Sequence, residues 1–430
     1  MRRILWCVAF FVVARAGFFF YHIWQEHVSD TLQEPETEEV STAENPLTGR
    51  LPYWQVDSAK TAIAVYDLEA GEMVFEQRAD QLMAPASCMK LLTAVTALKR
   101  FGPDALYESR LLYDGTVVDG TLYGTLIFEG DDDPLFESFS SMTAALRRKG
   151  IKQIDGEIVL DLARSDTLRP HSSAAAWDIP YHKLPLLLRG EPYVRRTLLY
   201  SLAAAGISVR QGRSPVRKSS DESFTRRIWL NKMERRATQV ASEKHSMREV
   251  LAPMLIHSSN IKAESVLWHI DNPLYRWSSM HISGAQQPCS ALWTFIREEM
   301  PMEDTAGFVI NDGSGLSPEN RLTARFLTHL LAYAWNDDEI RHVLLDEALA
   351  TPSHPVRRGS LIYRMSAPLF KGKVFCKTGT LTTIGSSSLS GYIHSDNGRW
   401  YAFSIINEDS PVWDSRLFQD RICRKIIEAR

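Results

Sequence analysis

The hydrophobic positions in the first part of the chain form two kinds of pattern. Residues 61–67 and 73–76 are short runs rich in apolar side chains, which predicts two strands joined by a hairpin over the stretch 68–72. After Pro85 the apolar residues recur every three or four positions, which predicts a helix over 87–100. We therefore expect the ordered part of the chain to begin near the first of these strands.

The middle of the chain has a different character. From residue 111 to 161, short alternating runs are separated by glycines, which predicts a β-rich segment with one helix over 139–149. Residues 165–240 show a weaker pattern, in which we expect a helix over 193–205 and an exposed polar loop over 212–225.

Helices and strands return in the last part of the chain. The dipeptide Asn397-Gly398 lies between two alternating runs and predicts a hairpin with a type I′ turn. No internal repeat is visible. The remaining predicted elements are helices over 246–255, 260–270 and 415–429 and strands over 373–381, 388–394 and 400–407.

The N-terminus has the features of an export signal. Arg2 and Arg3 precede an apolar stretch over 4–24, which Arg15 interrupts. One interpretation is a signal peptide cleaved at the small residues around 14–16, and the other is an uncleaved membrane anchor. We favour the anchor, because cleavage would leave three phenylalanines exposed behind the site. Both interpretations predict a periplasmic or other extracytoplasmic location.

The composition excludes some classes of protein. At 430 residues the chain is long enough for two domains, and its 44% hydrophobic content is ordinary for a globular protein. The formal net charge is −3, and basic groups such as 147–149 and 235–236 are short and scattered. A nucleic-acid-binding surface would gather its positive charge on one element, so we predict no nucleic-acid partner.

Cysteine, histidine and aspartate patterns do not support a metal site. The pairing of the five cysteines, of which Cys7 lies in the apolar N-terminal stretch, stays open because spacing does not establish connectivity. No Cys-x-x-Cys or His-Glu-x-x-His motif occurs, so a zinc hydrolase is unsupported. Asp131, Asp132 and Asp133 lack the spacing of a calcium-binding loop, and we interpret them as a solvated turn before Pro134. We expect no metal and no cofactor.

The first motif that could support catalysis is Ser-x-x-Lys at Ser87 and Lys90. Residues three apart share one face of a helix, so the lysine amine can reach the hydroxyl and serve as the base that a serine nucleophile needs. Ser259 and Lys262 have the same spacing. The pair at 85–86, Pro-Ala, distinguishes the first match, because it places Ser87 at a helix start where backbone N–H groups are free.

The second motif is Ser-x-Asn, and two occurrences of it have to be compared. Residues 395–397 spell Ser-Asp-Asn, as in many β-lactam-recognising enzymes, but they form the predicted hairpin turn. Ser258 and Asn260 lie between predicted helices and between the first and third motifs in the chain. We therefore choose Ser258 and Asn260 and interpret 395–397 as a solvent-facing turn.

The third motif is Lys377-Thr378-Gly379-Thr380 on a predicted strand. A cation followed by a hydroxyl suits a substrate carboxylate, and the glycine lets a substrate backbone approach the strand. An extended peptide could then pair along this edge. A rival serine site at Ser314 is excluded, because its neighbours do not form the Gly-x-Ser-x-Gly nucleophile elbow.

Taken together in this order, the motifs make the chain resemble the DacB-type D-alanyl-D-alanine carboxypeptidases/endopeptidases, which are low-molecular-mass penicillin-binding proteins. The resemblance runs from about residue 61 to 407. The matching stretches are residues 84–94, 257–264, 312–317, 377–382 and 388–392.

The resemblance implies an α+β fold of the serine β-lactamase/DD-peptidase (transpeptidase-like) kind, with an antiparallel sheet flanked by helices. Residues 51–104 and 241–430 would form the catalytic domain, and residues 105–240 would form an inserted β-rich subdomain. The acidic, proline-containing stretch 25–50 is expected to be a flexible linker. A second insert, common in the family, is expected to be reduced, because 180–192 runs almost directly into the next predicted helix.

The resemblance also implies catalytic roles. Ser87 would be the acylated nucleophile, Lys90 its base and Ser258 a proton relay to the leaving amine. Asn260 would hold a substrate amide. Two further residues are expected to shape the floor of the site: Asp312 and Ser314.

On the substrate side, Lys377 and Thr378 would bind the terminal carboxylate beside Gly379. The backbone N–H groups of Ser87 and Thr380 would form the oxyanion hole, which is usually the largest electrostatic contribution to acyl transfer.

Two cysteines flank the expected site. Cys88 follows the nucleophile, and Cys376 precedes Lys377 on its strand. Because successive strand side chains alternate between faces, Cys376 is expected to point away from the cleft. We therefore expect no disulfide between Cys88 and Cys376.

Three functional hypotheses remain. The first is a serine DD-peptidase that cleaves D-alanyl-D-alanine or D-alanyl-diamino acid bonds of peptidoglycan stem peptides and binds β-lactams covalently. The second is a β-lactamase or esterase on the same scaffold, and the third is a non-catalytic cell-wall-binding protein. The presence of all three motifs favours the first hypothesis. If residues 4–24 remain as an anchor, we expect them to contact the membrane.

Overall fold

The structure is a computed structural model that describes residues 57–174, 184–211, 236–271, 289–301 and 303–429. Several predictions lie outside the described residues, namely the signal peptide or anchor, the linker, the polar loop over 212–225 and part of the reduced second insert. Within the described ranges, no helix combines the length and apolar character needed to cross a bilayer.

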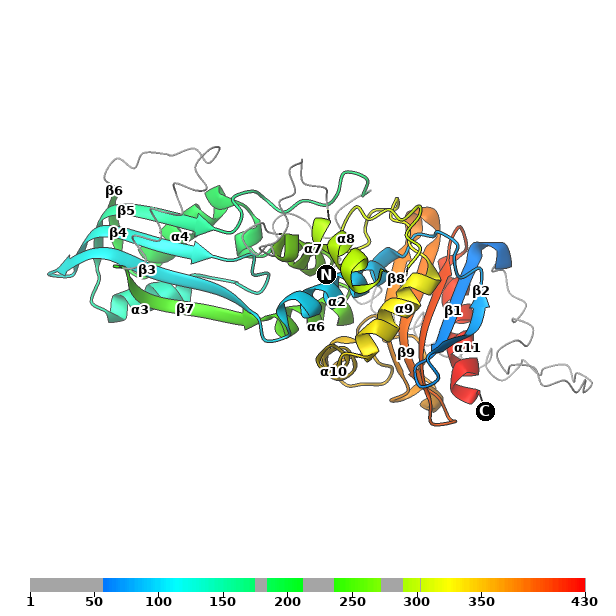
Figure 1. The fold of residues 1–430 in the computed structure, drawn as a ribbon. Helices are drawn as coiled ribbons and strands as arrows, with labels where there is room; N and C mark the ends of the chain where they lie inside the picture. Colours follow the sequence, from blue (N-terminus) through cyan, green and yellow to red (C-terminus); the bar gives the residue numbers. More distant parts are fainter. Residues whose placement is uncertain (1–56, 175–183, 212–235, 272–288, 302, 430) are drawn as a thin grey trace, which may run out of the picture. The chain divides into compact units, whose positions relative to one another are not determined.

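The first sheet is fully antiparallel and has the strand order β2-β1-β10-β9-β8 (Figure 1). It joins both ends of the described chain, because the N-terminal β1 pairs with the C-terminal β10. The strands are β1 (Thr61–Asp67), β2 (Glu72–Gln77), β8 (Val374–Leu381), β9 (Ser386–His394) and β10 (Trp400–Asn407). Every predicted strand of this sheet is confirmed within two residues.

Helices cover both faces of this sheet. Ala62 and Ala64 of β1 join the core that contains the helices α2 and α9, whereas Ile63 and Val65 join the core beneath α11. Successive side chains of a strand point to opposite faces of the sheet, so a continuous apolar run can fill the cores on both faces. The helices around this sheet are α2 (Met89–Phe101), α6 (Met247–Ile256), α7 (Asn260–Asp271), α8 (Ser290–Glu299), α9 (Ala324–Trp335), α10 (Asp338–His342) and α11 (Val412–Glu428).

The second sheet has the order β6-β5-β4-β3-β7 and is mixed (Figure 1). The β3–β4 and β3–β7 pairs are antiparallel, but β4–β5 and β5–β6 are parallel, because α3 and α4 connect those strands. The strands are longer than the predicted short runs. The elements are β3 (Leu106–Val118), β4 (Thr121–Gly130), α3 (Ser140–Arg148), β5 (Gln153–Leu162), α4 (Glu191–Ala204), β6 (Ser208–Gln211) and β7 (Thr238–Ser246).

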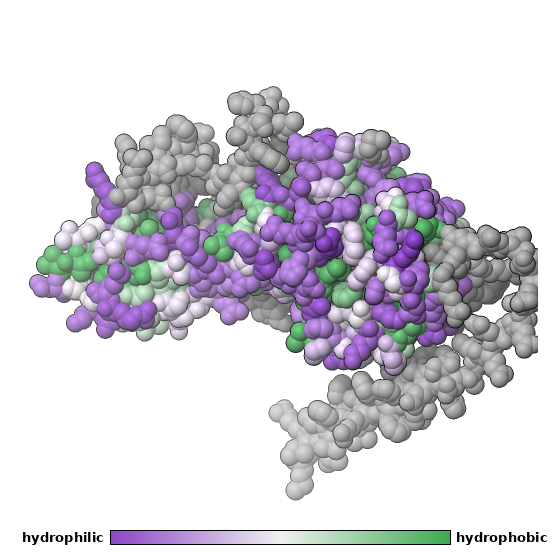
Figure 2. All heavy atoms as spheres, turned by 60° about the horizontal axis from the view of Figure 1, so that its bottom comes forward, coloured by the Kyte–Doolittle hydropathy of each residue, from purple (hydrophilic) through white to green (hydrophobic). Residues whose placement is uncertain are grey.

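Exposed apolar side chains gather at the tip of the β3–β4 hairpin, where Val117, Val118 and Tyr123 are solvent-exposed. The face drawn in Figure 2 is mostly hydrophilic, with a hydrophobic patch toward the end of this sheet.

The predicted type I′ turn at Asn397-Gly398 is wrong in type, although the hairpin exists. Gly398 has a φ of 85°, but Asn397 is absent from the non-glycine residues with positive φ, and a type I′ turn needs two such residues. The backbone N–H of Gly398 bonds to the carbonyl of Ser395. The hairpin with two positive φ values lies instead at Asp119 and Gly120, between β3 and β4.

The prediction of a solvated acidic turn is also wrong. Asp132 and Asp133 are 3% and 0% exposed. Asp133 bonds to His245 of β7, with 2.7 Å between Oδ2 and Nδ1, and the Ser265 hydroxyl of α7 donates to the Asp132 carbonyl. The run of acids is buried because β7 and α7 pack over the end of β4, a contact that local sequence cannot reveal.

The four cysteines of the described residues are free and buried. Cys376 lies in the core beneath α11, whereas Cys88 packs in the core on the opposite face of the sheet. The predicted absence of a Cys88–Cys376 bridge is confirmed.

Candidate active site

Ser87 lies in a short 3-10 helix, Ala86–Cys88, that leads directly into α2. Its hydroxyl Oγ is 2.9 Å from Nζ of Lys90, one helical turn further on. Ala86 has a φ of 46°, a strained value for a residue with a side chain. Such strain persists only where surrounding contacts impose it, and here it presents Ser87 at the start of the helix.

The Lys90 side chain is fully buried and joins the first two motifs. Besides Ser87, its amine donates to Asn260 Oδ1 and to the Ser314 carbonyl, each at 2.6 Å. Asn260 is the first residue of α7, and Ser258 precedes it in a left-handed conformation with a φ of 58°. The structure thus brings together residues that are 170 and 224 positions apart.

The loop that carries Ser314 is held by Asp312. Oδ1 of Asp312 accepts from the N–H of Gly315 at 2.7 Å, and Oδ2 accepts from the N–H of Ser317 at 2.6 Å. Asp312 is 2% exposed. Its carboxylate therefore fixes the carbonyl that receives the Lys90 amine.

A second buried carboxyl, Glu264, lies beneath this loop. Its Oε1 accepts from the N–H of Ser314 at 2.9 Å, and the side chain is fully enclosed. Burial, together with the nearby negative charge of Asp312, raises the pKa of Glu264 to about 7. The sequence motif included this residue, but nothing in the pattern indicated its contact with the loop.

Strand β8 runs beside the short helix of Ser87. The Cys88 thiol contacts the Lys377 carbonyl at 3.2 Å, and the Ser388 hydroxyl of β9 donates to the Pro85 carbonyl at 2.6 Å. A Cβ atom added to Gly379 would lie 2.9 Å from the backbone nitrogen of Ser87. The glycine is thus needed for the close approach of strand and helix.

Lys377 is fully buried on this strand, and its amine donates to the Thr378 carbonyl at 2.7 Å. Burial lowers the pKa of Lys377 to about 8. No carboxylate within the described ranges forms an ion pair with it. A buried ammonium of this kind gains from an incoming anion, since the anion would offset its lost hydration.

Sequence reasoning missed Arg416, a half-buried residue of α11. Its guanidinium donates to Oγ1 of Thr380 at 3.0 Å, and burial lowers the pKa of Arg416. Arginine is common on helix surfaces, and no sequence signal connected this one with a motif 36 positions away.

The alternative motifs lie elsewhere. The prediction of a solvent-facing turn over 395–397 is confirmed for Asp396 and Asn397 but wrong for Ser395, which is buried and donates to the Ile427 carbonyl. Ser259 accepts a bond from the backbone N–H of Lys262, so this pair forms a helix start.

The backbone arrangement is similar to that of known serine enzymes. Penicillin-binding protein 4 (DacB) from Haemophilus influenzae aligns with a TM-score of 0.63 at 17% identity, covering 86% of this chain and 98% of that one. A predatory peptidoglycan endopeptidase from Bdellovibrio bacteriovorus aligns with a TM-score of 0.54 at 16% identity, covering 85% and 90%. The predicted fold class, that of the serine DD-peptidases, is confirmed.

Sequence comparison leads to the family. The chain belongs to the D-Ala-D-Ala carboxypeptidase 3 (S13) family, whose model matches residues 52–182 and 218–423. It is 23% identical over 458 residues to a D-alanyl-D-alanine carboxypeptidase of an Actinomadura species, covering 87% of this chain and 82% of the relative. A carboxypeptidase of Mycobacterium tuberculosis is 24% identical over 400 residues, covering 86% and 80%.

This membership decides among the three hypotheses. The chain is a serine-type D-Ala-D-Ala carboxypeptidase, which agrees with the first hypothesis. Because the cell wall lies outside the cytoplasm, the site of action is extracytoplasmic.

Proposed function

We propose that Ser87 attacks the carbonyl carbon of the penultimate D-alanine and forms an acyl-enzyme, with Lys90 as general base. The observation that carries this assignment is the 2.9 Å contact between the amine of the fully buried Lys90 and the hydroxyl of Ser87, which is partly exposed. A serine hydroxyl becomes nucleophilic only when a neighbouring base takes its proton.

The three contacts of Lys90 suit the role of a base. Asn260 Oδ1 and the Ser314 carbonyl can each take one N–H of a neutral amine. The remaining lone pair then faces the Ser87 hydroxyl, which is the geometry for proton abstraction. Asp312 and Glu264 support this arrangement by holding the loop of Ser314.

The chemical steps follow from this geometry. The Ser87 Oγ–carbon bond forms while its proton passes to Lys90, and the carbon–nitrogen bond then breaks as the leaving amine takes a proton. Ser258, in the loop before Asn260, is proposed as the relay for that proton, and Asn260 as a holder of a substrate amide. Water then attacks the carbonyl carbon of the acyl-enzyme and gives a proton to the base, and the carbon–oxygen bond to Ser87 breaks as Oγ takes a proton back.

We place the oxyanion hole at the backbone N–H groups of Ser87 and Thr380. The close approach of Gly379 to the Ser87 nitrogen supports this, because it brings the two backbone segments side by side. Donors of this kind stabilise the negative charge that develops on the carbonyl oxygen.

The carboxylate of the leaving residue would bind between Lys377, Thr378, Thr380 and Arg416. Two cations flank this part of β8, and neither forms an ion pair within the described residues, although the charge of Asp420 acts on Arg416. Such a pocket suits the terminal D-alanine of a stem peptide. It also suits a crosslink whose leaving amine lies on a carbon that bears a carboxylate.

The domain assignment also stays a proposal. We propose a catalytic domain over 51–104 and 241–430 and an inserted subdomain over 105–240. The second sheet begins at Leu106, which supports the first boundary, and its strand β7 runs to Ser246, six residues past the second. We further propose periplasmic action with membrane contact through residues 4–24, a segment that lies outside the described residues.

Acylation and product analysis test the proposed chemistry. Ser87→Ala should form no adduct with fluorescent penicillin and release no D-alanine from peptidoglycan, measured by mass spectrometry. Lys90→Ala should fold but keep less than a tenth of the acylation rate. Ser259→Ala, which alters the alternative motif, should acylate normally. D-alanine release by Ser87→Ala would remove this serine from the mechanism.

A further inference from the structure

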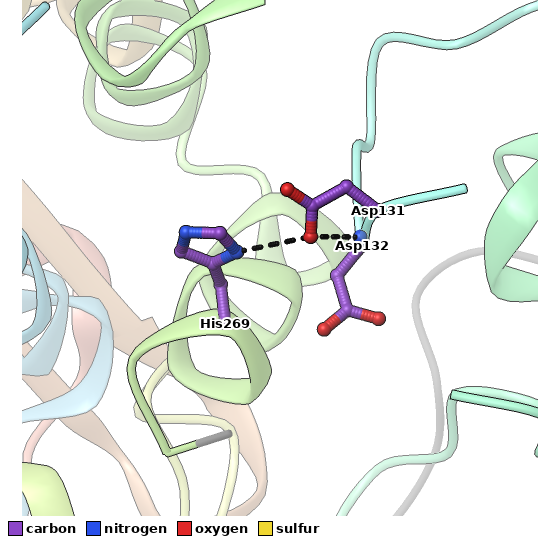
Figure 3. A group of neighbouring side chains, drawn as sticks. All are labelled: Asp131, Asp132 and His269. Atoms are coloured by element: carbon purple, nitrogen blue, oxygen red, sulfur yellow. Dashed lines mark hydrogen bonds and ion pairs between the residues drawn. The ribbon is translucent and has the colours of Figure 1, made fainter. Parts of the chain in front are cut away.

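A second group of polar side chains lies outside the site described so far. Asp131 and Asp132 follow the end of β4, and His269 lies in the last turn of α7 (Figure 3). Asn260, at the other end of α7, is nine residues away, which is about 14 Å along a helix. The group is thus separate from the acyl-transfer site.

The spacing of the three side chains is that of metal ligands. Each offers one ligand atom, and these atoms lie within 4.8 Å of one another. Nδ1 of His269 is 3.3 Å from Oδ1 of Asp131. Two ligands bonded to one tetrahedral cation at ordinary zinc distances are separated by about 3.3 Å. Rotation of the Asp132 carboxylate about its side-chain bonds would bring the third ligand closer.

Asp132 provides an independent observation. Its side chain is 3% exposed, and its Oδ2 is buried without a hydrogen-bond partner. Arg164 is near enough for its charge to act on Asp132, but its guanidinium donates to the Trp268 carbonyl and stacks on that indole. A buried carboxylate oxygen that lacks a hydrogen-bond donor is energetically unfavourable, and a bound cation would offset that penalty.

The surroundings hold the ligands in place. The rings of Phe101 and Tyr107 pack against the His269 ring, with centroids 5.3 and 4.4 Å away. The Ser265 hydroxyl donates to the Asp132 carbonyl, and the N–H of Asp132 bonds to Oδ1 of Asp131. Packing and outer hydrogen bonds of this kind orient metal ligands.

We propose that Asp131, Asp132 and His269 bind one divalent transition-metal cation of the Zn²⁺, Co²⁺ or Mn²⁺ type. One imidazole and two carboxylates favour these ions over Mg²⁺ and Ca²⁺, which prefer oxygen ligands alone. The cation would connect the end of β4 in the second sheet with α7, the helix that begins at Asn260. Its role is to stabilise this connection, and it takes no part in the acyl transfer.

Cobalt titration of the purified full-length protein, freed of metal with a chelator, tests the site. We expect one Co²⁺ per chain, d–d absorption bands in the visible range and a higher melting temperature. Asp132→Asn keeps the shape of the side chain and should weaken Co²⁺ binding at least tenfold. His269→Gln should do the same and change the absorption spectrum.

Asp346→Asn is the matched control. Asp346 and His342 also form a pair at 2.7 Å, but both side chains are more than 60% exposed. This variant should bind Co²⁺ as the wild type does. Circular dichroism establishes that each variant is folded. Absence of stoichiometric binding by the wild type, or unchanged binding by both Asp132→Asn and His269→Gln, would overturn the proposal.

Discussion

At the scale of residues, two buried lysines differ in their partners. The Lys90 amine contacts Ser87, Asn260 and Ser314, whereas the Lys377 amine donates to the adjacent Thr378 carbonyl. The first arrangement orients an amine for proton transfer, and the second leaves an ammonium ready for an anion. Both lysines were predicted from motifs, but this difference depends on Asn260 and Ser314, which come from distant parts of the chain.

Arg416→Ala tests the proposed carboxylate pocket. A hydrogen bond to a charged group contributes about 1.5–3 kcal/mol, and partial exposure reduces this. We therefore expect KM for a peptide ending in a free carboxylate to rise about tenfold, with kcat little changed. The same variant should leave KM unchanged for a peptide whose terminal carboxylate is amidated.

The control for this prediction is Arg424→Ala, since Arg424 is an exposed arginine of the same helix. It should alter neither KM value. If Arg416→Ala raised KM equally for the free and the amidated peptide, Arg416 would support the fold instead of binding the carboxylate.

At the scale of elements, the site depends on the close packing of β8 against the short helix of Ser87. Serines of β9 make this possible, because Ser386 and Ser388 donate to the carbonyls of Ala84 and Pro85. Strands β8 and β9 and the helix that begins at Ser87 were themselves predicted to within a few residues. Their close packing was not predicted, because the small residues at alternate positions of β9 could pack against many different helices or strands.

Gly379→Ala should disturb this packing. The added Cβ would lie 2.1 Å from the Ser388 hydroxyl and 2.9 Å from the Ser87 nitrogen. Forcing a methyl group into such a space costs about 1–3 kcal/mol. We expect penicillin acylation to slow at least tenfold, measured by stopped-flow fluorescence, together with a lower melting temperature.

Gly398→Ala provides the comparison, because its Cβ would meet open space and only its φ of 85° opposes the change. This variant should lose some stability and acylate at the wild-type rate. A wild-type rate in Gly379→Ala would contradict the proposed oxyanion hole between Ser87 and Thr380.

At the scale of the whole molecule, buried carboxyls make folding depend on pH. Burial raises the pKa of Glu264 to about 7, so the folded protein holds a proton there that the unfolded chain releases near pH 4.5. The contribution of Glu264 to the free energy of unfolding is fully present below the pKa of the unfolded chain. This contribution is lost as the pH rises through the pKa of Glu264 in the folded protein.

Glu264→Gln removes this titration and keeps the shape of the side chain. Between pH 5 and 7.5 the free energy of unfolding should therefore fall less in the variant than in the wild type, measured by urea unfolding. Glu298→Gln changes an exposed glutamate of α8 and should follow the wild type. Parallel curves for Glu264→Gln and the wild type would exclude Glu264 as the titrating group.

The sequence by itself determined the elements of the catalytic sheet, the motif residues Ser87, Lys90, Asn260 and Lys377 and the family resemblance. The hydrophobic period and the spacing of short motifs involve residues close together in the chain, so both can be recognised from the sequence alone. The tertiary structure alone decided which distant groups meet. It buried the acidic run after β4, put Arg416 beside Thr380 and placed Glu264 under the loop of Ser314. Burial and charge pairing depend on packing between elements, and no local pattern records which elements will pack together.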